Sequence, residues 1–282
     1  MIIRQSYQNY VENTSVQSAK SVGNNNRKIY KMIHKIVFSL IGLLLLSISG
    51  ISQDISGKQI IEKADELQRG ETNQGEMSMT IIRPKWERTI TMKNWSKGRE
   101  FSMTYITSPV KDKGQVFLKR NSEMWNWVPT INRMIKIPPS MMSQGWMGSD
   151  YSNDDILKES SIVVDYTHKI IGKETLENIE CYKIELSPKE DAAVVWGKVI
   201  KWISKDEYWQ LKTEYFDEDE ELIRTEVASE IKQFSDRKLP SKMEIIPADK
   251  PGQRTVVYII SSEFNVKLDE GFFSQQNMKR VH

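Results

Sequence analysis

The feature that most constrains the fold is a long succession of short segments in which apolar and polar residues alternate. From Met77 to Ile260 there are about twelve such segments, spaced about 8 to 15 residues apart. Their connections carry turn residues such as Glu177-Asn178, and no long helical pattern interrupts the series. This order predicts an antiparallel meander rather than βαβ units.

A sheet of this size is expected to curl, because strongly twisted open sheets rarely extend beyond about ten strands. The predicted fold class is therefore mainly β: a half-open antiparallel β-barrel, built from one curved sheet of about 11 to 12 strands, with short lid helices. Several strands carry Met, Ile, Phe or Trp on one face and Lys, Arg, Glu or Thr on the other. This alternation is typical of a curved sheet whose outer wall is solvated and whose inner face borders a cavity.

Two short apolar elements are candidate lids for that cavity. The first is Ile55 to Leu67, which overlaps a predicted amphipathic helix from Ser56 to Arg69 that Ser56 can cap and Gly70 can end. The second is the stretch from 138 to 159, which follows three predicted strands between Val116 and Ile137.

The second stretch contains a Met- and Trp-rich segment that carries no charge between Lys136 and Asp150. Methionine side chains adapt their shape at little cost and are common at changing apolar surfaces. The underside of a lid and ordinary core packing are both consistent with such a segment. Gly148, which follows it, is expected to allow a tight turn with positive φ.

The run FLKR-x(3)-MWNWVP-x(3)-R-x-I-x-IPPSMM, followed by WMGSDYSNDDI, resembles the LolA-like outer membrane lipoprotein-sorting protein family. The resemblance covers roughly Ile55 to the C-terminus and is most specific at Trp125 to Pro129, Arg133 and Met147 to Asp155. It implies a half-open barrel, closed by helices, that holds acyl chains. The partners it implies are an acylated lipoprotein or lipid, together with an inner-membrane exporter and an outer-membrane acceptor.

The candidate ligand-binding residues combine this resemblance with the predicted apolar faces and the Met- and Trp-rich segment. They are Met77, Met79, Met92, Phe101, Met103, Trp125, Trp127, Arg133, Met141, Met142, Trp146 and Met147. Arg133 is included only as a local candidate, because the chain does not match the motif that carries the cavity-edge arginine of related carriers.

The N-terminal part differs in character from the rest of the chain. Residues 1–31 are polar and predicted to be disordered or an upstream extension, and residues 32–52 are predicted to be a cleaved secretory signal peptide. A membrane anchor is the alternative, but the uncharged run from Ile36 to Ser52 is short for a span. No Cys stands directly after this run, so the mature N-terminus is not expected to carry the lipid anchor of a bacterial lipoprotein. We therefore expect residues 53–282 to form one soluble periplasmic lipid- or lipoprotein-binding domain.

Charge argues against a nucleic-acid partner. The chain has 40 Lys and Arg against 38 Asp and Glu, and residues 1–52 hold six of the former and one of the latter. The remaining 34 basic and 37 acidic residues leave no overall basic excess.

No catalytic or metal-binding motif stands out, so we expect no catalytic residue, no metal and no cofactor. The acidic group Asp150, Asp154 and Asp155 is best explained as the first turn of a helix capped by Ser152. The lone Cys181 is expected to be a buried structural thiol.

These observations favour a periplasmic carrier or chaperone for acyl chains. A lipid-sensing or accessory binding subunit of an export system is the main alternative, and transfer of cargo to an acceptor would separate the two. A glycan-acting enzyme is a third possibility, which would require two carboxyl groups facing one cleft.

Overall fold

The computed structural model describes Met32 and residues 55–158 and 162–281. The predicted upstream extension and almost all of the predicted signal peptide lie outside the described residues. Within them, a compact unit begins at Ile55 and contains every element discussed below. No helix in the described ranges has both the length and the apolar character that a membrane span requires.

A single antiparallel sheet of thirteen strands forms among the described residues, which confirms the predicted fold class with slightly more strands than expected. In chain order the strands are β1 (Thr72–Arg83), β2 (Trp86–Lys97), β3 (Phe101–Ser108), β4 (Val116–Arg120), β5 (Glu123–Val128), β6 (Arg133–Lys136), β7 (Tyr166–Leu176), β8 (Ile179–Pro188), β9 (Lys198–Ser204), β10 (Gln210–Phe216), β11 (Leu222–Phe234), β12 (Arg237–Pro247) and β13 (Arg254–Phe264).

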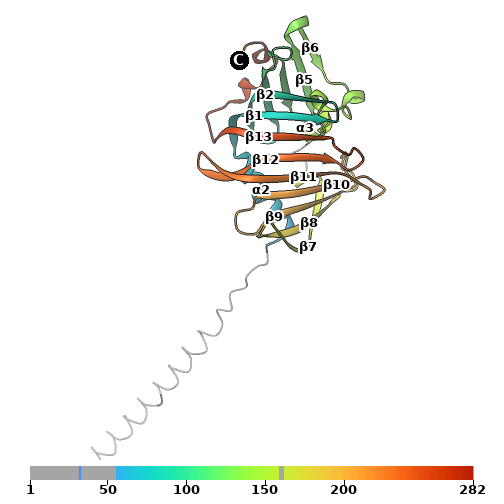
Figure 1. The fold of residues 1–282 in the computed structure, drawn as a ribbon. Helices are drawn as coiled ribbons and strands as arrows, with labels where there is room; N and C mark the ends of the chain where they lie inside the picture. The colour runs from blue at the N-terminus through green and yellow to red at the C-terminus, as the bar shows by residue number, and fades with distance from the viewer. Residues whose placement is uncertain (1–31, 33–54, 159–161, 282) are drawn as a thin grey trace, which may run out of the picture. The chain divides into compact units, whose positions relative to one another are not determined.

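The sheet is open, because its order runs β6-β5-β4-β3-β2-β1-β13-β12-β11-β10-β9-β8-β7 and leaves β6 and β7 as its two edges. Each half is a meander, and the pairing of β1 with β13 joins them in the middle of the sheet (Figure 1). The chain between the two edge strands must therefore pass from one end of the sheet to the other. This connection contains the one-turn helices Pro139–Met141 and Trp146–Gly148 and the helix α3 (Asn153–Lys158).

The helix α2 (Gly57–Arg69) begins and ends as its sequence predicts. Ser56 and Gln59 form a reciprocal capping box, and Gly70 with φ 65° closes the last turn through its backbone N–H to Glu66. Its apolar side packs Ile60 and Ile61 against the inner side of β7 to β9, in a cluster that includes Ile184. The helix therefore covers the β7 end of the sheet.

Two further apolar clusters hold the rest of the unit together. The first, called here the central cluster, packs the connecting segment (residues 138–158) on the middle of the sheet. Its buried members are Met79, Ile81, Ile90, Met92, Ile106, Phe117, Met124, Trp146, Leu157, Ile245 and Val257. The second, called here the C-terminal cluster, packs the last residues of the chain against β3 to β5. Its buried members are Met103, Tyr105, Val116, Leu118, Trp125, Phe273 and Met278.

Strand limits differ from the sequence prediction in β11 and β12, for which alternation predicts shorter strands, from Leu222 to Ala228 and from Met243 to Ile246. The predicted strands end at Ala228 and begin again at Met243, whereas the pairing continues to Phe234 and Arg237. A tight turn at Ser235, with φ 50°, joins them. The outer part of this hairpin is mostly polar, but Phe234 and Leu239 are buried against Phe264, so packing and pairing extend both strands beyond the part of the sequence that alternates clearly.

Candidate functional site

A cavity of about 340 Å³ lies between the inner face of the sheet, α2 and the connecting segment. This volume falls within the range of small-molecule and cofactor sites in proteins, which is roughly 300–1,000 Å³. Its lining residues come from both halves of the sheet and from both candidate lids. The cavity therefore depends on the whole fold rather than on one loop.

One part of the cavity wall is apolar and lies at the centre of the sheet. It is formed by Met77, Met79, Met92, Met243, Val257 and Ile259. These side chains come from β1, β2, β12 and β13, whose pairing places Met77 beside Met92 and Met79 beside Val257. Flexible thioethers on this wall suit a ligand of variable apolar shape.

The connecting segment covers this wall with the Met- and Trp-rich residues that the sequence singles out. Trp146 is 6% exposed, lines the cavity and stacks edge-to-face on Phe117 with ring centroids 5.2 Å apart. Met142 and Met147 are half-buried and pack on the central cluster. Gly148 has φ 82°, as predicted, and Met147 before it also has positive φ.

A buried arginine on β11 anchors the start of α3 to the sheet. The Arg224 guanidinium donates to both carboxylate oxygens of Asp155, at 2.7 and 3.2 Å, and lies 3.3 Å from Glu226 Oε1. It also stacks on aromatic rings, with its carbon 4.3 Å from the Tyr215 centroid and 4.8 Å from that of Trp196. All five side chains line the cavity.

The electrostatics of this cluster favour a permanently charged arginine. Burial lowers the pKa of Arg224, but Glu226, Tyr215 and Asp155 raise it by more, so the net shift is upward. Burial also raises the pKa of Tyr215, with a further contribution from Glu226. Burial raises the pKa of Tyr166 to about 12, and its hydroxyl donates to the carbonyl of Trp196.

A second anchor of the connecting segment is Asp150, which lies five residues before Asp155. Asp150 accepts from Arg83 at 3.0 Å and from the Thr255 hydroxyl at 2.6 Å, and its own backbone N–H donates to that hydroxyl oxygen. Arg83 also donates to the carbonyl of Gly148. Ser152 and Asp155 form the predicted reciprocal cap of α3. The predicted cap by Ser152 and Asp155 is thus confirmed, and Asp154 lies in the first turn as expected, whereas Asp150 precedes the helix and binds β1 and β13 instead. The carboxylate of Asp155 also holds the segment on β11.

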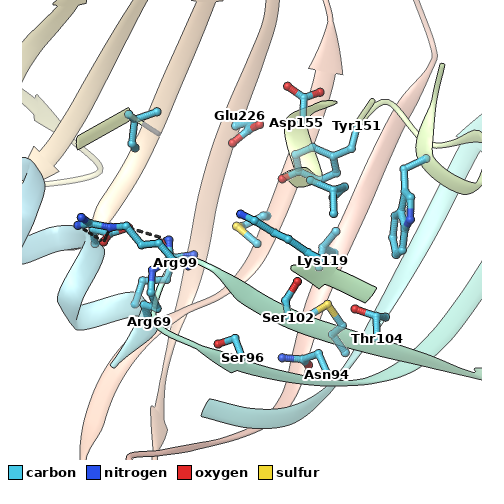
Figure 2. Close-up of a pocket in the computed structure, with 18 of the residues that line it drawn as sticks. Arg69, Asn94, Ser96, Arg99, Ser102, Thr104, Lys119, Tyr151, Asp155 and Glu226 are labelled. Carbon is cyan, nitrogen blue, oxygen red and sulfur yellow. Dashed lines mark hydrogen bonds and ion pairs between the residues drawn. The ribbon is translucent and has the colours of Figure 1, made fainter. Parts of the chain in front are cut away.

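The other end of the cavity is polar. Figure 2 shows Asn94, Ser96, Ser102 and Thr104 grouped on neighbouring strands beside Lys119. Nearby, Asp65 of α2 binds both Arg69, at 2.8 Å, and Arg99, at 2.7 Å.

The structure brings five of the predicted site residues to this cavity. They are Met77, Met79, Met92, Phe101 and Trp146. Met142 and Met147 lie in the adjoining cover, and Met141 contributes its carbonyl, which accepts from the side chain of Asn153.

The other four predicted residues lie elsewhere. Met103, Trp125 and Trp127 pack in the C-terminal cluster, because strand alternation turns Ser102 and Thr104, not Met103, toward the cavity. The C-terminal segment covers that other face of the sheet, which the prediction took to be solvated. Arg133 is exposed on the edge strand β6 and is not among the lining residues.

Sequence reasoning did not single out Arg224 or Lys119. Each lies in an alternating segment at a position that reads as an outward-facing charge, as in Leu-Ile-Arg-Thr-Glu of β11. One sequence pattern could have identified Arg224. Arg224 and Glu226 are two residues apart and so lie on one face of β11, and the acidic first turn of the predicted helix offers a carboxylate partner for a buried arginine.

Neither Cys181 nor the described histidine adds a second site. Cys181 is buried and free, as predicted, in a cluster with Trp202 and Leu211. Burial lowers the pKa of His168, whose Nε2 lies 2.7 Å from the carbonyl of Ile162. Across the described residues no group of three or more His, Cys, Asp or Glu has the arrangement of a metal site.

Comparison with known proteins agrees with this architecture. A family model described as "Uncharacterized protein" matches residues 98–280. A search of curated protein sequences gives no significant match. Among solved structures, a DUF1329 family protein from Desulfovibrio piger is 22% identical with a TM-score of 0.72, covering 79% of this chain and 97% of that one.

Two further structures have the same fold. A putative outer membrane lipoprotein-sorting protein domain from Vibrio parahaemolyticus is 21% identical, with a TM-score of 0.70 and coverage of 79% of this chain and 98% of that one. A LolA superfamily protein from Nitrosomonas europaea is 22% identical, with a TM-score of 0.68 and coverage of 79% and 100%. The chain therefore belongs to the family whose model matches residues 98–280, and it has the LolA-like fold of the outer membrane lipoprotein-sorting proteins.

Proposed function

We propose that residues 53–282 form a periplasmic carrier that binds the acyl chains of a lipoprotein or lipid and releases them toward the outer membrane. The observation that carries this proposal is the cavity of about 340 Å³ with an apolar wall, which lies under a segment that joins the two unpaired edges of the sheet. The LolA-like fold supports the same role.

The energetics of such binding need no specific motif. Burial of apolar surface contributes about 25 cal/mol per Å², so an acyl chain that buries a few hundred Å² gains several kcal/mol. Met77, Met92 and Met243 supply a wall that can reshape around the chain.

A matched pair of substitutions on β13 tests the proposal. Ile259 lines the cavity, whereas its neighbour Ile260 is 53% exposed on the opposite face. Ile259→Trp fills the cavity and should reduce loading with a fluorescent fatty acid at least about tenfold. Ile260→Trp should load normally.

Two measurements accompany that pair. Native mass spectrometry of protein purified from the bacterial envelope should show a copurifying lipid in the wild type and none in Ile259→Trp. Loaded wild-type protein should then transfer its fatty acid to acceptor vesicles. Equal loading of both variants, or binding without any transfer, would contradict the carrier role.

A further inference from the structure

The inner wall of the sheet changes from apolar to polar along a sharp boundary. Across β1, β2 and β3, Met77, Met92 and Ile106 are consecutive partners and form an apolar row. Four residues earlier along β1, at Asn73, the corresponding row is polar. Strand geometry puts these two rows about 13 Å apart on the same face.

The polar row runs across four adjacent strands. Asn73 pairs with Ser96, Ser96 with Ser102, and Ser102 with Lys119, so one line of side chains crosses β1 to β4. All four line the cavity. Between this row and the apolar row lie Asn94 and Thr104, which also line the cavity and are partners of each other.

This polar wall is not simply the solvated mouth of the cavity. Lys119 is only 7% exposed, although its side chain ends in an ammonium group. The hydroxyl of Ser96 is buried and has no hydrogen-bond partner among the described residues. Such a hydroxyl is costly in an empty site and becomes favourable when a bound molecule supplies the partner.

Charge is distributed unevenly between the two ends of the cavity. The end near α2 is lined by Arg69, Arg99 and Lys119 with the single carboxylate of Asp65, whereas the end near α3 carries more carboxylates than cations. In Figure 2, Lys119 lies between Ser96 and Ser102 on one side and Asp155 and Glu226 on the other. An anionic group is therefore favoured at the α2 end and disfavoured at the α3 end.

We propose that the row Asn73, Ser96, Ser102 and Lys119 is a headgroup site, and that the cargo is an acyl amphiphile with an anionic head, carboxylate or phosphate, whose chain lies on the Met77 wall. This inference rests on the proposed carrier function and makes its cargo specific. The hydroxyls of Ser96 and Ser102 donate to the anionic oxygens and the Lys119 ammonium adds a charge-assisted hydrogen bond.

The test compares ligands that share a chain and differ in the head. Displacement of a fluorescent fatty acid is measured with palmitate, with monopalmitoyl phosphatidic acid and with hexadecanol, and inorganic phosphate serves as the head without a chain. The wild-type protein should bind both anionic amphiphiles about tenfold more tightly than hexadecanol, a difference of about 1.4 kcal/mol. Phosphate alone should not displace the probe.

Three variants locate the preference. Lys119→Met keeps the side-chain length and should abolish the preference for the anionic head while hexadecanol affinity changes less than about twofold. Lys93→Met, on the opposite face of β2, removes an equal charge and should leave the preference intact. Ser96→Ala should leave the melting temperature of the empty protein equal or higher, because it deletes a buried hydroxyl without a partner, yet should reduce the preference.

The outcomes separate this inference from the carrier proposal. If none of the amphiphiles displaces the probe, the carrier proposal itself fails. If palmitate and hexadecanol bind equally, or if folded Lys119→Met and Ser96→Ala both keep the full preference, only the headgroup site is refuted. Displacement by inorganic phosphate alone would show a plain anion site instead of an amphiphile site.

Discussion

The buried Arg224 cluster gives the sharpest stability prediction. The side chains of Arg224, Asp155 and Glu226 are only 6%, 8% and 10% exposed. Arg224→Met keeps much of the aliphatic volume but leaves the two carboxylates without their guanidinium. Removing one partner from a buried ion pair in this way costs about 3–5 kcal/mol, because an uncompensated charge stays buried. For a folded unit of this size, that corresponds to a fall of roughly 6–20 °C in melting temperature.

The assay is thermal and urea denaturation of Arg224→Met beside a matched control. Arg254→Met breaks an ion pair with Glu244 in which the arginine is 46% exposed and the distance is 3.6 Å, so its loss should stay below about 1 kcal/mol. Adding Glu226→Gln to Arg224→Met should restore part of the stability, since it removes one buried charge. The reasoning is refuted if Arg224→Met is no less stable than Arg254→Met, or if the added Glu226→Gln destabilises further.

Three shorter predictions address the cover and the acid dependence of stability. Changing Met142 and Met147 together to Gln should weaken fatty-acid binding about tenfold with only a small change in melting temperature, whereas a collapse in stability would make both residues ordinary core. Gly148→Val should speed limited proteolysis of residues 138–158 without altering the sheet signal in circular dichroism, because φ is 82° there although no atom lies within 4 Å of the added Cβ. Burial raises the pKa of Asp65, but its bonds to Arg69 and Arg99 lower that pKa by more, so the net shift is downward. The ionised carboxylate therefore stabilises the fold above its ordinary pKa, and this contribution is lost as the pH falls through the lower pKa of the folded state. Acid denaturation of Asp65→Asn should therefore show a shallower pH dependence than the wild type.

The elements that could be predicted from the sequence are those whose signals are local. Alternation identified the strands on both sides of the sheet, and the residues flanking α2 fixed its first and last turns. The capping role of Ser152 and Asp155 was predictable for the same reason. Each of these depends on residues within a few positions of one another.

The choice of face was not predictable, because it depends on what covers each side of the sheet. The apolar face of β3 would be expected to face the cavity, because the apolar side of an antiparallel sheet usually packs on the core. Met103 on that face instead packs with Phe273 and Met278, which lie about 170 residues later in the chain. The inner face of β3 is therefore the one with Ser102 and Thr104. Because the C-terminal residues cover the apolar face, the polar residues Ser102 and Thr104 line the cavity, although the sequence alone places them on the solvated outer face.

The connecting segment is held by charged hydrogen bonds in one part and by apolar packing in another. The difference determines which part of the cover a ligand in the cavity can displace. Residues 150–155 are held by charged and hydroxyl partners on β1, β11 and β13, which an acyl chain cannot replace. The side chains of Met142 and Met147 pack on the central cluster, and lipid methylene groups can substitute for that packing at little net change in free energy. The backbone of this part is tied to the anchored part instead, since the N–H of Asp154 donates to the carbonyl of Met142 and the side chain of Asn153 donates to that of Met141. Since β6 and β7 are unpaired edges, displacing the Met-rich part breaks no hydrogen bond of the sheet. In the proposed carrier, the side chains of residues 138–147 are thus the part of the cover whose packing an acyl chain can replace, whereas the charged anchors of residues 150–155 stay in place.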